Sequence, residues 1–199
     1  MAIIWSCPVA PSTYAAAGRE ISVPAAICPG CRRGLTGWGG YWRWMRGEQV
    51  PEQRIWIRRG RCKRCRHTHA LLPSFLFVSR LDVAQVIGTA LDQAANGTGA
   101  RTIAQELAVP HTTVRDWWRR VRSKAPTLLA SLLVLAISLD PAPVDLTTDG
   151  SPAMLEALRC AWQRTQRRLA QRAPDQWAFW SLVSGGLALA ANTSPPLPG

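Results

Sequence analysis

The chain has 199 residues, of which 47% are hydrophobic, so its composition is that of a packed protein and excludes a disordered tail. It carries 24 Lys and Arg against 12 Asp and Glu, and its formal net charge of +12 indicates an acidic partner such as nucleic acid. Residues 28–80 alone hold 12 basic and 2 acidic residues, a net of +10 (12 − 2). This concentration predicts a dedicated binding surface rather than general basicity.

The N-terminal residues 1–24 are expected to form an extension without a secretory signal, because they lack a basic stretch followed by an apolar run. Two apolar runs, residues 128–139 and 177–191, are shorter than the roughly 20 residues that a membrane helix needs. We therefore expect no membrane and a cytoplasmic, nucleoid-associated location. In that reducing compartment disulfides are not expected.

Four of the six cysteines form two C-x-x-C pairs, Cys28 with Cys31 and Cys62 with Cys65, thirty residues apart. This spacing is typical of a zinc ribbon, in which two turns supply four thiolates to one structural Zn²⁺. The sequence leaves three alternatives: a redox pair, a partial disulfide set, or a ligand set in which a histidine replaces a thiolate. No thioredoxin-like context accompanies the pairs, which disfavours the redox alternative.

The remaining two cysteines and two nearby histidines are not expected to bind the metal ion. Cys7 and Cys160 have no partner pair and are expected to be small buried or free thiols. His67 and His69 follow Cys65 closely and are expected to be exposed polar or DNA-proximal groups rather than ligands.

Residues 25–76 are predicted to form the ribbon, with strands at residues 41–46 and 54–58 because both are rich in aromatic and β-branched residues. About half of Trp42, Trp44 and Trp56 are expected in the ribbon core, and the others on a face that contacts nucleic acid. The arginines of these strands are predicted to contact DNA phosphates; they are Arg43, Arg46, Arg54, Arg58 and Arg59.

Residues 79–124 are predicted to form a helix-turn-helix domain. Its first helix follows a capping box at residues 79–82 and carries apolar residues at helical spacing from Val83 to Ala94. A turn at residues 108–110 separates two further helices, of which the last opens with a polar cap at residues 111–113. Ala108 stands where such turns usually take glycine, while Trp117 is expected in the core.

The last helix of this unit is predicted to enter the DNA major groove. Its base-reading residues are predicted to be His111, Thr112, Arg115, Asp116 and Arg119. Further phosphate contacts are predicted for Arg101, Arg120, Arg122 and Lys124.

Residues 127–192 are predicted to form a C-terminal helical region with a Pro-rich linker at residues 140–152. The helix at 127–139 is apolar nearly all round and should be buried. The helix at 154–173 should place Arg164, Arg167, Arg168 and Arg172 on a polar face, and a third helix is expected at 177–191. These helices are a candidate homodimer interface, and residues 193–199 a disordered tail.

The runs Cys28-Pro-Gly-Cys31, residues 57–65, 69–75 and 112–117 resemble an uncharacterised actinobacterial family of zinc-ribbon and helix-turn-helix proteins that carries a domain-of-unknown-function label. The arrangement is similar to the N-terminal DNA-binding parts of insertion-sequence transposases. The resemblance implies sequence-specific binding to double-stranded DNA, in transcriptional regulation or in transposition.

The predicted fold class is α+β, mainly α. No nuclease, hydrolase or phosphate-loop motif is evident, so an enzyme is not expected. The alternatives are a protein-interaction adaptor and a non-catalytic remnant of a transposase.

Overall fold

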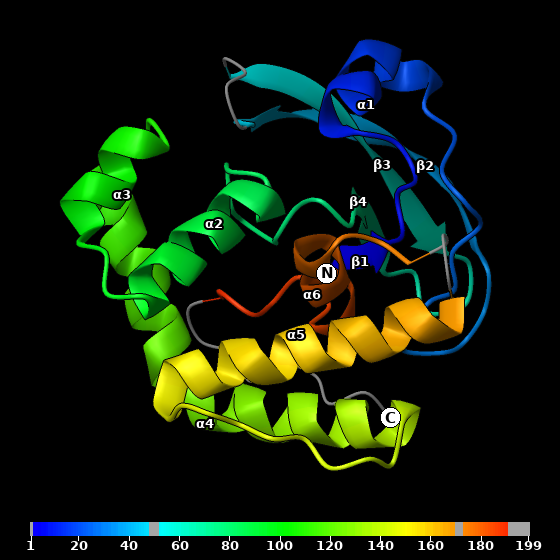
Figure 1. Cartoon of the computed structure of the whole chain (residues 1–199). Helices are drawn as coiled ribbons and strands as arrows, with labels where there is room; N and C mark the ends of the chain where they lie inside the picture. Colours follow the sequence, from blue (N-terminus) through cyan, green and yellow to red (C-terminus); the bar gives the residue numbers. More distant parts are fainter. Residues whose placement is uncertain (1, 48–51, 170–172, 191–199) are drawn as a thin grey trace.

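The computed structural model describes residues 2–47, 52–169 and 173–190. Its elements form a mixed α/β fold, with a sheet at one side and a layer of helices below it (Figure 1). In chain order they are β1 (Ala2–Trp5), α1 (Pro11–Ala17), a 3₁₀ turn (Gly18–Glu20), β2 (Leu35–Met45), β3 (Gln53–Cys62), β4 (Thr68–Pro73), α2 (Ala84–Ala95), α3 (Ala100–Glu106), α4 (His111–Leu139), α5 (Gly150–Leu169) and α6 (Gln176–Val183).

The sheet has the strand order β1-β4-β3-β2. β2 pairs with β3 and β3 with β4 in antiparallel fashion, whereas β1 runs parallel to β4, with Ala2 opposite Ala70. The strands predicted at 41–46 and 54–58 lie within β2 and β3. β1 was missed, because the segment expected to be an extension joins the sheet through a partner almost seventy residues away.

The two faces of the β2–β3 pair differ. Ile55 and Ile57 of β3 are fully buried, while their neighbours Arg54 and Trp56 point to the opposite face, as strand alternation requires. Trp42 and Trp44 are exposed and Trp56 is half-buried. The prediction that about half of these tryptophans are core residues is therefore wrong, since the aliphatic side chains of β3 fill that role.

Helix α2 begins at Ala84, not at the predicted capping box. Its N-cap residue, Val83, makes no side-chain cap hydrogen bond. Asp82 is instead buried and accepts a 2.6 Å hydrogen bond from Arg46 Nε, so its carboxylate serves the sheet rather than the helix end. On the packed face of α2, an added Cβ on Gly88 would lie 2.0 Å from the ring of Trp177 in α6, and this glycine permits the close helix crossing.

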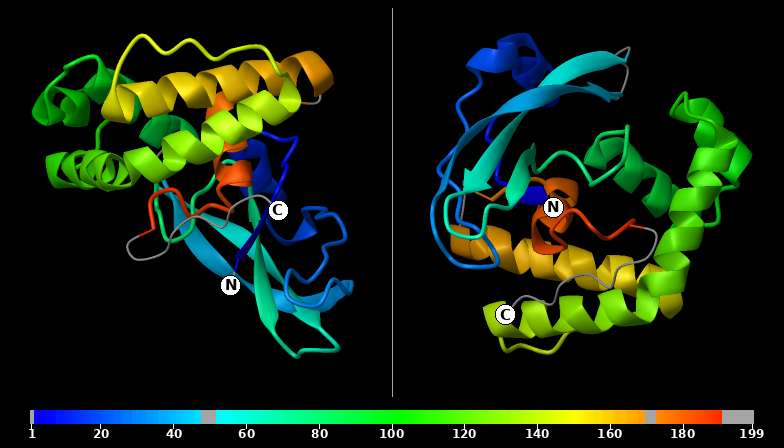
Figure 2. Two further views of the ribbon diagram at one scale, coloured as in Figure 1. Left: turned by 90° about the horizontal axis from the view of Figure 1, so that it is seen from below. Right: turned by 180° about the vertical axis from the view of Figure 1, so that it is seen from behind.

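Helix α4 is a single helix of 29 residues with Pro126 inside it. The sequence predicted separate helices here, with a break between residues 124 and 127. Figures 1 and 2 show that α4 bends near its middle, as expected where a proline removes one backbone donor. The polar cap predicted at residues 111–113 is also wrong, since the N-cap is Pro110 without a side-chain cap hydrogen bond.

The C-terminal half of α4 packs on α5 along one side only (Figure 2). Leu128, Leu132 and Ala136 are buried, but Val134 is 66% and Ile137 is 51% exposed. The prediction that this apolar segment is buried all round is wrong for that outer side. By length and composition alone, α4 contains an 18-residue stretch apolar enough to cross a membrane, and 28% of that stretch is buried.

Helix α5 starts inside the predicted linker, which leaves residues 140–149 without helix or strand. Arg164 does not lie on a polar face as predicted, because it is 5% exposed. It donates hydrogen bonds to the carbonyl oxygens of Ala136, Asp140, Ala142 and Pro143, and so ties the end of α4 to the linker. The third helix is shorter than predicted, and Arg172, Ala191 and the predicted tail lie outside the described residues.

One cluster of buried side chains connects the sheet to the helices. It includes Ile57 of β3, Leu91 of α2, Trp117 of α4, Leu158 of α5 and Trp180 of α6. The cysteine turns and the α3–α4 unit are therefore attached to the same core.

Candidate functional site

Two tight turns bring Cys28, Cys31, Cys62 and Cys65 together. All four Sγ atoms lie within 4.8 Å of one another, with 3.2 Å between Cys31 and Cys62 and 3.6 Å between Cys28 and Cys65. A tetrahedral zinc ion with Zn–S bonds of about 2.3 Å would hold its sulfurs about 3.8 Å apart. A disulfide needs about 2.05 Å, and all four cysteines are free. The cluster therefore fits a four-coordinate metal ion and not a disulfide pair.

The two turns have the same backbone structure. In each, the first cysteine donates its N–H to the carbonyl five residues later, and the residue after the second cysteine donates back to the first cysteine's carbonyl. That residue, Arg32 in one turn and Arg66 in the other, has a left-handed φ of 58° or 65°. The shared C-x-x-C-R pattern is the sequence signal for this equivalence.

The thiols are already polarised. Hydrogen bonds from the backbone N–H of Cys65 and the thiol of Cys31 lower the pKa of Cys62 to about 6. The hydrogen bond to Cys62 and burial raise the pKa of Cys31 to about 12. A bound cation would supply the charge needed to deprotonate all four.

His69 contacts this cysteine cluster from the buried side. It is 1% exposed, and its Nε2 lies 3.6 Å from Cys28 Sγ, while His67 is exposed. The prediction of an exposed residue is thus wrong for His69, because β4 turns its ring inward beside the cysteines. Burial lowers the pKa of His69, so a neutral ring can donate to the sulfur.

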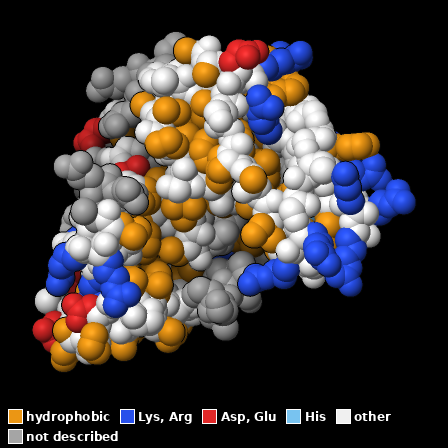
Figure 3. All heavy atoms as spheres, turned by 90° about the vertical axis from the view of Figure 1, so that its right-hand side faces the viewer, with side chains coloured by type: hydrophobic (Ala, Val, Ile, Leu, Met, Phe, Trp, Pro, Cys, Tyr) orange, Lys and Arg blue, Asp and Glu red, His pale blue; other side chains and the backbone are white. Residues whose placement is uncertain are grey.

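Basic side chains rim the two cysteine turns. Five of them are exposed, namely Arg32, Arg33, Lys63, Arg64 and Arg66. In Figure 3 lysine and arginine side chains gather along one side of the molecule, beside a band of hydrophobic side chains. Four thiolates on a divalent ion carry a net charge of about −2. Five cations exceed this, so the rim stays positive. We call these five residues the knuckle cations.

Helices α3 and α4 form a corner joined by residues 107–110. Val114, Trp117 and Val121 of α4 are buried, which confirms the predicted core role of Trp117. Ala108 in the turn has a φ of 52°, the left-handed conformation that glycine adopts most easily. The corner lies on the opposite side of the molecule from the cysteine end of β3 (Figures 1 and 2).

The other side of α4 carries most of the predicted base-reading residues. Thr112, Arg115 and Arg119 are exposed, follow each other at helical spacing and line a groove of about 850 Å³. His111 is exposed at the first position of the helix. Among the described residues, Arg115 has no hydrogen-bond or ion-pair partner, so its guanidinium is available.

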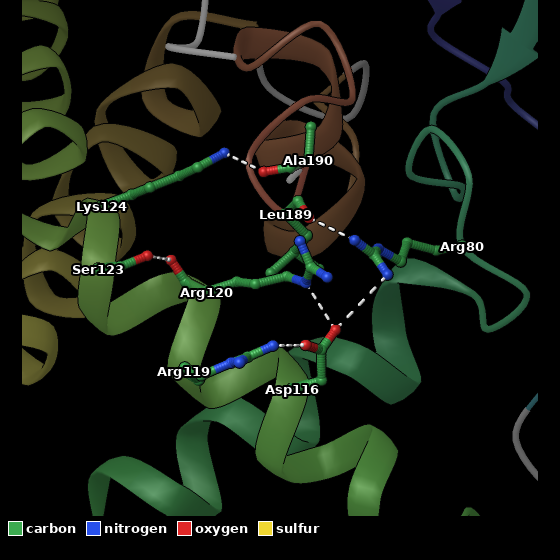
Figure 4. Close-up of polar contacts among 8 residues, drawn as sticks. All are labelled: Arg80, Asp116, Arg119, Arg120, Ser123, Lys124, Leu189 and Ala190. Atoms are coloured by element: carbon green, nitrogen blue, oxygen red, sulfur yellow. Dashed lines mark hydrogen bonds and ion pairs between the residues drawn. The ribbon is translucent and has the colours of Figure 1, made fainter. Parts of the chain in front are cut away.

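Asp116 organises the arginines around it (Figure 4). Its carboxylate accepts 2.6 Å hydrogen bonds from Arg119 and Arg120, and Arg80 lies 3.8 Å away. The hydrogen bond from Arg120 is the main reason that the pKa of Asp116 is lowered. Asp116 therefore positions neighbouring guanidinium groups instead of presenting a free acceptor.

Several of the predicted phosphate contacts have internal partners. Arg43 donates to the carbonyl oxygens of Phe77 and Arg80, and Arg46 pairs with Asp82. Arg58 donates to the carbonyls of Arg19 and Ile21, and Lys124 to that of Ala190 (Figure 4). Arg54, Arg59, Arg101 and Arg122 are exposed and make no hydrogen bond or ion pair with another described residue, whereas Arg58 is exposed but held by its two carbonyl partners. The sequence could not identify Arg43, Arg58 and Lys124 as internally bonded, because backbone carbonyl partners leave no residue pattern, and the Asp82 partner of Arg46 lies 36 residues away.

Cys7 and Cys160 lie away from the cluster and are half-buried. The Cys7 thiol donates to the carbonyl of Val9, and burial raises the pKa of that thiol.

Residues 28–117 match the family model of a Domain of unknown function (DUF6431). No curated protein and no solved structure matches the chain significantly. The matched range begins at the first cysteine of the cluster and ends at Trp117, so one domain model spans both the cysteine turns and the start of α4.

Proposed function

We propose that this chain is a zinc-stabilised protein that binds double-stranded DNA at specific sequences. The observation that carries the proposal is the division of α4 into two sides. Thr112, Arg115 and Arg119 are exposed in one row, while Val114 and Trp117 anchor the helix to the core. A helix held in this way by a short turn from α3 has the form of a recognition helix.

The chemistry of the row suits base edges in the major groove. Arg115 offers a free planar fork that can pair bidentately with guanine, and Thr112 and His111 at the helix start offer hydrogen-bonding groups. Asp116 restrains Arg119 and thereby lowers the conformational entropy that Arg119 would lose on binding. Exposed Arg101 and Arg122 flank the row and would contact phosphates.

The metal in this proposal is one structural Zn²⁺ bound by Cys28, Cys31, Cys62 and Cys65. Four thiolates leave no open position, so the ion would stabilise the turns and would not activate water. The proposed role is accordingly not enzymatic. The resemblance to transposases remains a prediction, namely that the DNA binding serves transposition or transcriptional regulation.

The test is selection of bound sequences from random duplex DNA with the full chain. Arg115→Ala with Arg119→Ala should abolish the selected preference while non-specific binding remains. A matched control, Arg167→Ala with Arg168→Ala, removes the same charge from exposed positions of α5 and should keep the preference. Equal preference in all three proteins would refute base reading by α4. If the Arg115→Ala with Arg119→Ala variant still binds DNA as the parent does and still captures a protein partner, the adaptor alternative is favoured.

A homodimer is the second part of the proposal, because two recognition helices would double the length of the site. The exposed apolar side of α4, with Val134 and Ile137, is the candidate interface. Val134→Glu should turn a dimer in sedimentation analysis into a monomer without loss of zinc. A monomeric parent chain would contradict this part alone.

A further inference from the structure

The outer face of β2 carries aromatic rings that the proposed function does not use. Trp38 is 49%, Trp42 is 38% and Trp44 is 52% exposed, and Tyr41 of the same strand is 40% exposed. Among the described residues, these four make up half of the eight large hydrophobic side chains that are exposed. Trp42 and Trp44, two residues apart, point to the same side of the strand, and adjacent exposed aromatic side chains of this kind mark an interaction site.

The strand register places Trp42, Trp44 and Arg54 on a common face. Trp42 lies opposite Trp56, and Trp44 lies opposite Arg54. Trp42 and Trp56 touch edge to face, with ring centroids 5.3 Å apart. This pair fixes the Trp42 ring, while the buried isoleucines of β3 hold the sheet from the other side. The rings are therefore presented on a rigid support.

Arg54 covers the two rings with contacts that a ligand can displace. Cζ of Arg54 lies 5.7 Å from the centroid of Trp42 and 5.8 Å from that of Trp44, near the outer limit of a cation–π contact. Cζ of Arg61 lies 4.3 Å from the centroid of Trp38. By strand alternation Arg54 shares the face of Trp42 and Trp44, whereas Arg61, seven residues further along β3, contacts Trp38 on the other side of the sheet.

We propose that this face, made of Trp42, Trp44 and Arg54, binds single-stranded DNA. Unpaired bases would stack on the two indole rings, and Arg54 would contact a phosphate. Flat aromatic surfaces suit unpaired bases, because every base has a π-face and duplex bases are already stacked on each other. The choice of DNA over RNA rests on the proposed function of α4.

The spacing of the rings agrees with this ligand. Residues two apart on a strand are about 6.7 Å apart, twice the roughly 3.4 Å rise of stacked bases in one DNA strand. Trp42 and Trp44 can therefore each hold a base of an unstacked strand, with room for one layer between them. An acidic peptide would use the arginine but leave the rings without a partner.

The test uses the zinc-loaded full chain and a labelled twelve-nucleotide oligothymidine, whose anisotropy reports binding. Trp42→Ala with Trp44→Ala should weaken binding at least tenfold, since each stacked base is worth about 1–3 kcal/mol. The matched control, Trp42→Phe with Trp44→Phe, should recover most of the affinity because it keeps the stacking surface. Zinc content and circular dichroism check that each variant is folded.

Two further arms make the outcome decisive. Arg54→Gln should lower the slope of log affinity against log salt by about one. Arg115→Ala with Arg119→Ala should leave oligothymidine binding unchanged. Failure of duplex recognition by α4 can therefore be distinguished from failure of single-strand binding by the β2–β3 face. The proposal is overturned if the Trp→Ala pair binds as the parent does, if oligouridine binds more than tenfold tighter than oligothymidine, or if polyglutamate displaces the strand as well as DNA does.

Discussion

The cysteine-bearing sheet and the α3–α4 corner use positive charge in different ways. Residues 28–80 hold a net charge of +10, yet Arg43, Arg46 and Arg58 of the sheet are tied to carbonyls or to Asp82. The corner, residues 100–139, holds a smaller net charge of +4 (6 − 2), yet Arg115 on it is exposed and free of partners among the described residues. The net charge of a segment therefore counts its basic residues but does not show which of them are available. The internal contacts of each guanidinium decide which arginines can bind a ligand.

Metal removal should give the largest effect and should separate the two regions. Cys62→Ser is expected to lose the single bound zinc and to destabilise the chain by several kcal/mol, because metal binding energy contributes to folding of such turns. The loss should be concentrated in the sheet, since α4 is anchored by Trp117 and Val121. Metal analysis and hydrogen exchange measure both.

Cys160→Ser is the matched control, because that thiol lies outside the cluster and should leave zinc content unchanged. A parent chain that binds no zinc after purification without chelator would contradict the assignment.

The knuckle cations should govern the salt dependence of DNA binding. Replacing Arg32, Arg33, Lys63, Arg64 and Arg66 together by Ser should flatten the slope of log affinity against log salt by up to about 4.5, if each contacts one phosphate. The sequence preference should stay as it is, because Arg115 and Arg119 are unchanged. Titrations at four salt concentrations give the slope, and a lost preference with an unchanged slope would reverse the roles of the two regions.

Much of the site follows from local pattern. The C-x-x-C spacing predicts the cysteine cluster, and apolar residues at helical spacing predict α2 and the buried side of α4. The features that the sequence missed depend on distant partners. β1 is a strand because β4 offers an edge, His69 is buried because β4 faces the cysteine turns, and Arg164 finds four carbonyls only when α4 and the linker meet.

Arg164 provides a test of the helical region alone. Arg164→Met should destabilise the chain by about 3 kcal/mol, because carbonyls that accept from a buried guanidinium lose their donors. Arg167→Met is the control on the same helix. Arg167 is 68% exposed in its side chain, and its pair with Asp140 should be worth less than about 1 kcal/mol. Thermal denaturation of both variants compares them, and equal losses would mean that burial of Arg164 contributes nothing.

The smallest expected effect concerns the turn of the corner. Ala108 is exposed and has a φ of 52°, which costs an alanine about 1–2 kcal/mol relative to the right-handed region. Ala108→Gly removes that strain and adds about 0.5–1 kcal/mol of chain entropy in the unfolded state, so a net stabilisation of about 0.5 kcal/mol is expected. Ala130→Gly, at an exposed helical position of α4, should instead destabilise by about 0.5–1 kcal/mol. Opposite signs in chemical denaturation would show that the corner tolerates strain at this residue, whereas the same sign would mean that the turn does not need a left-handed residue. Since Ala108 carries no group that reads a base, the selected DNA sequence should be the same for both variants and the parent.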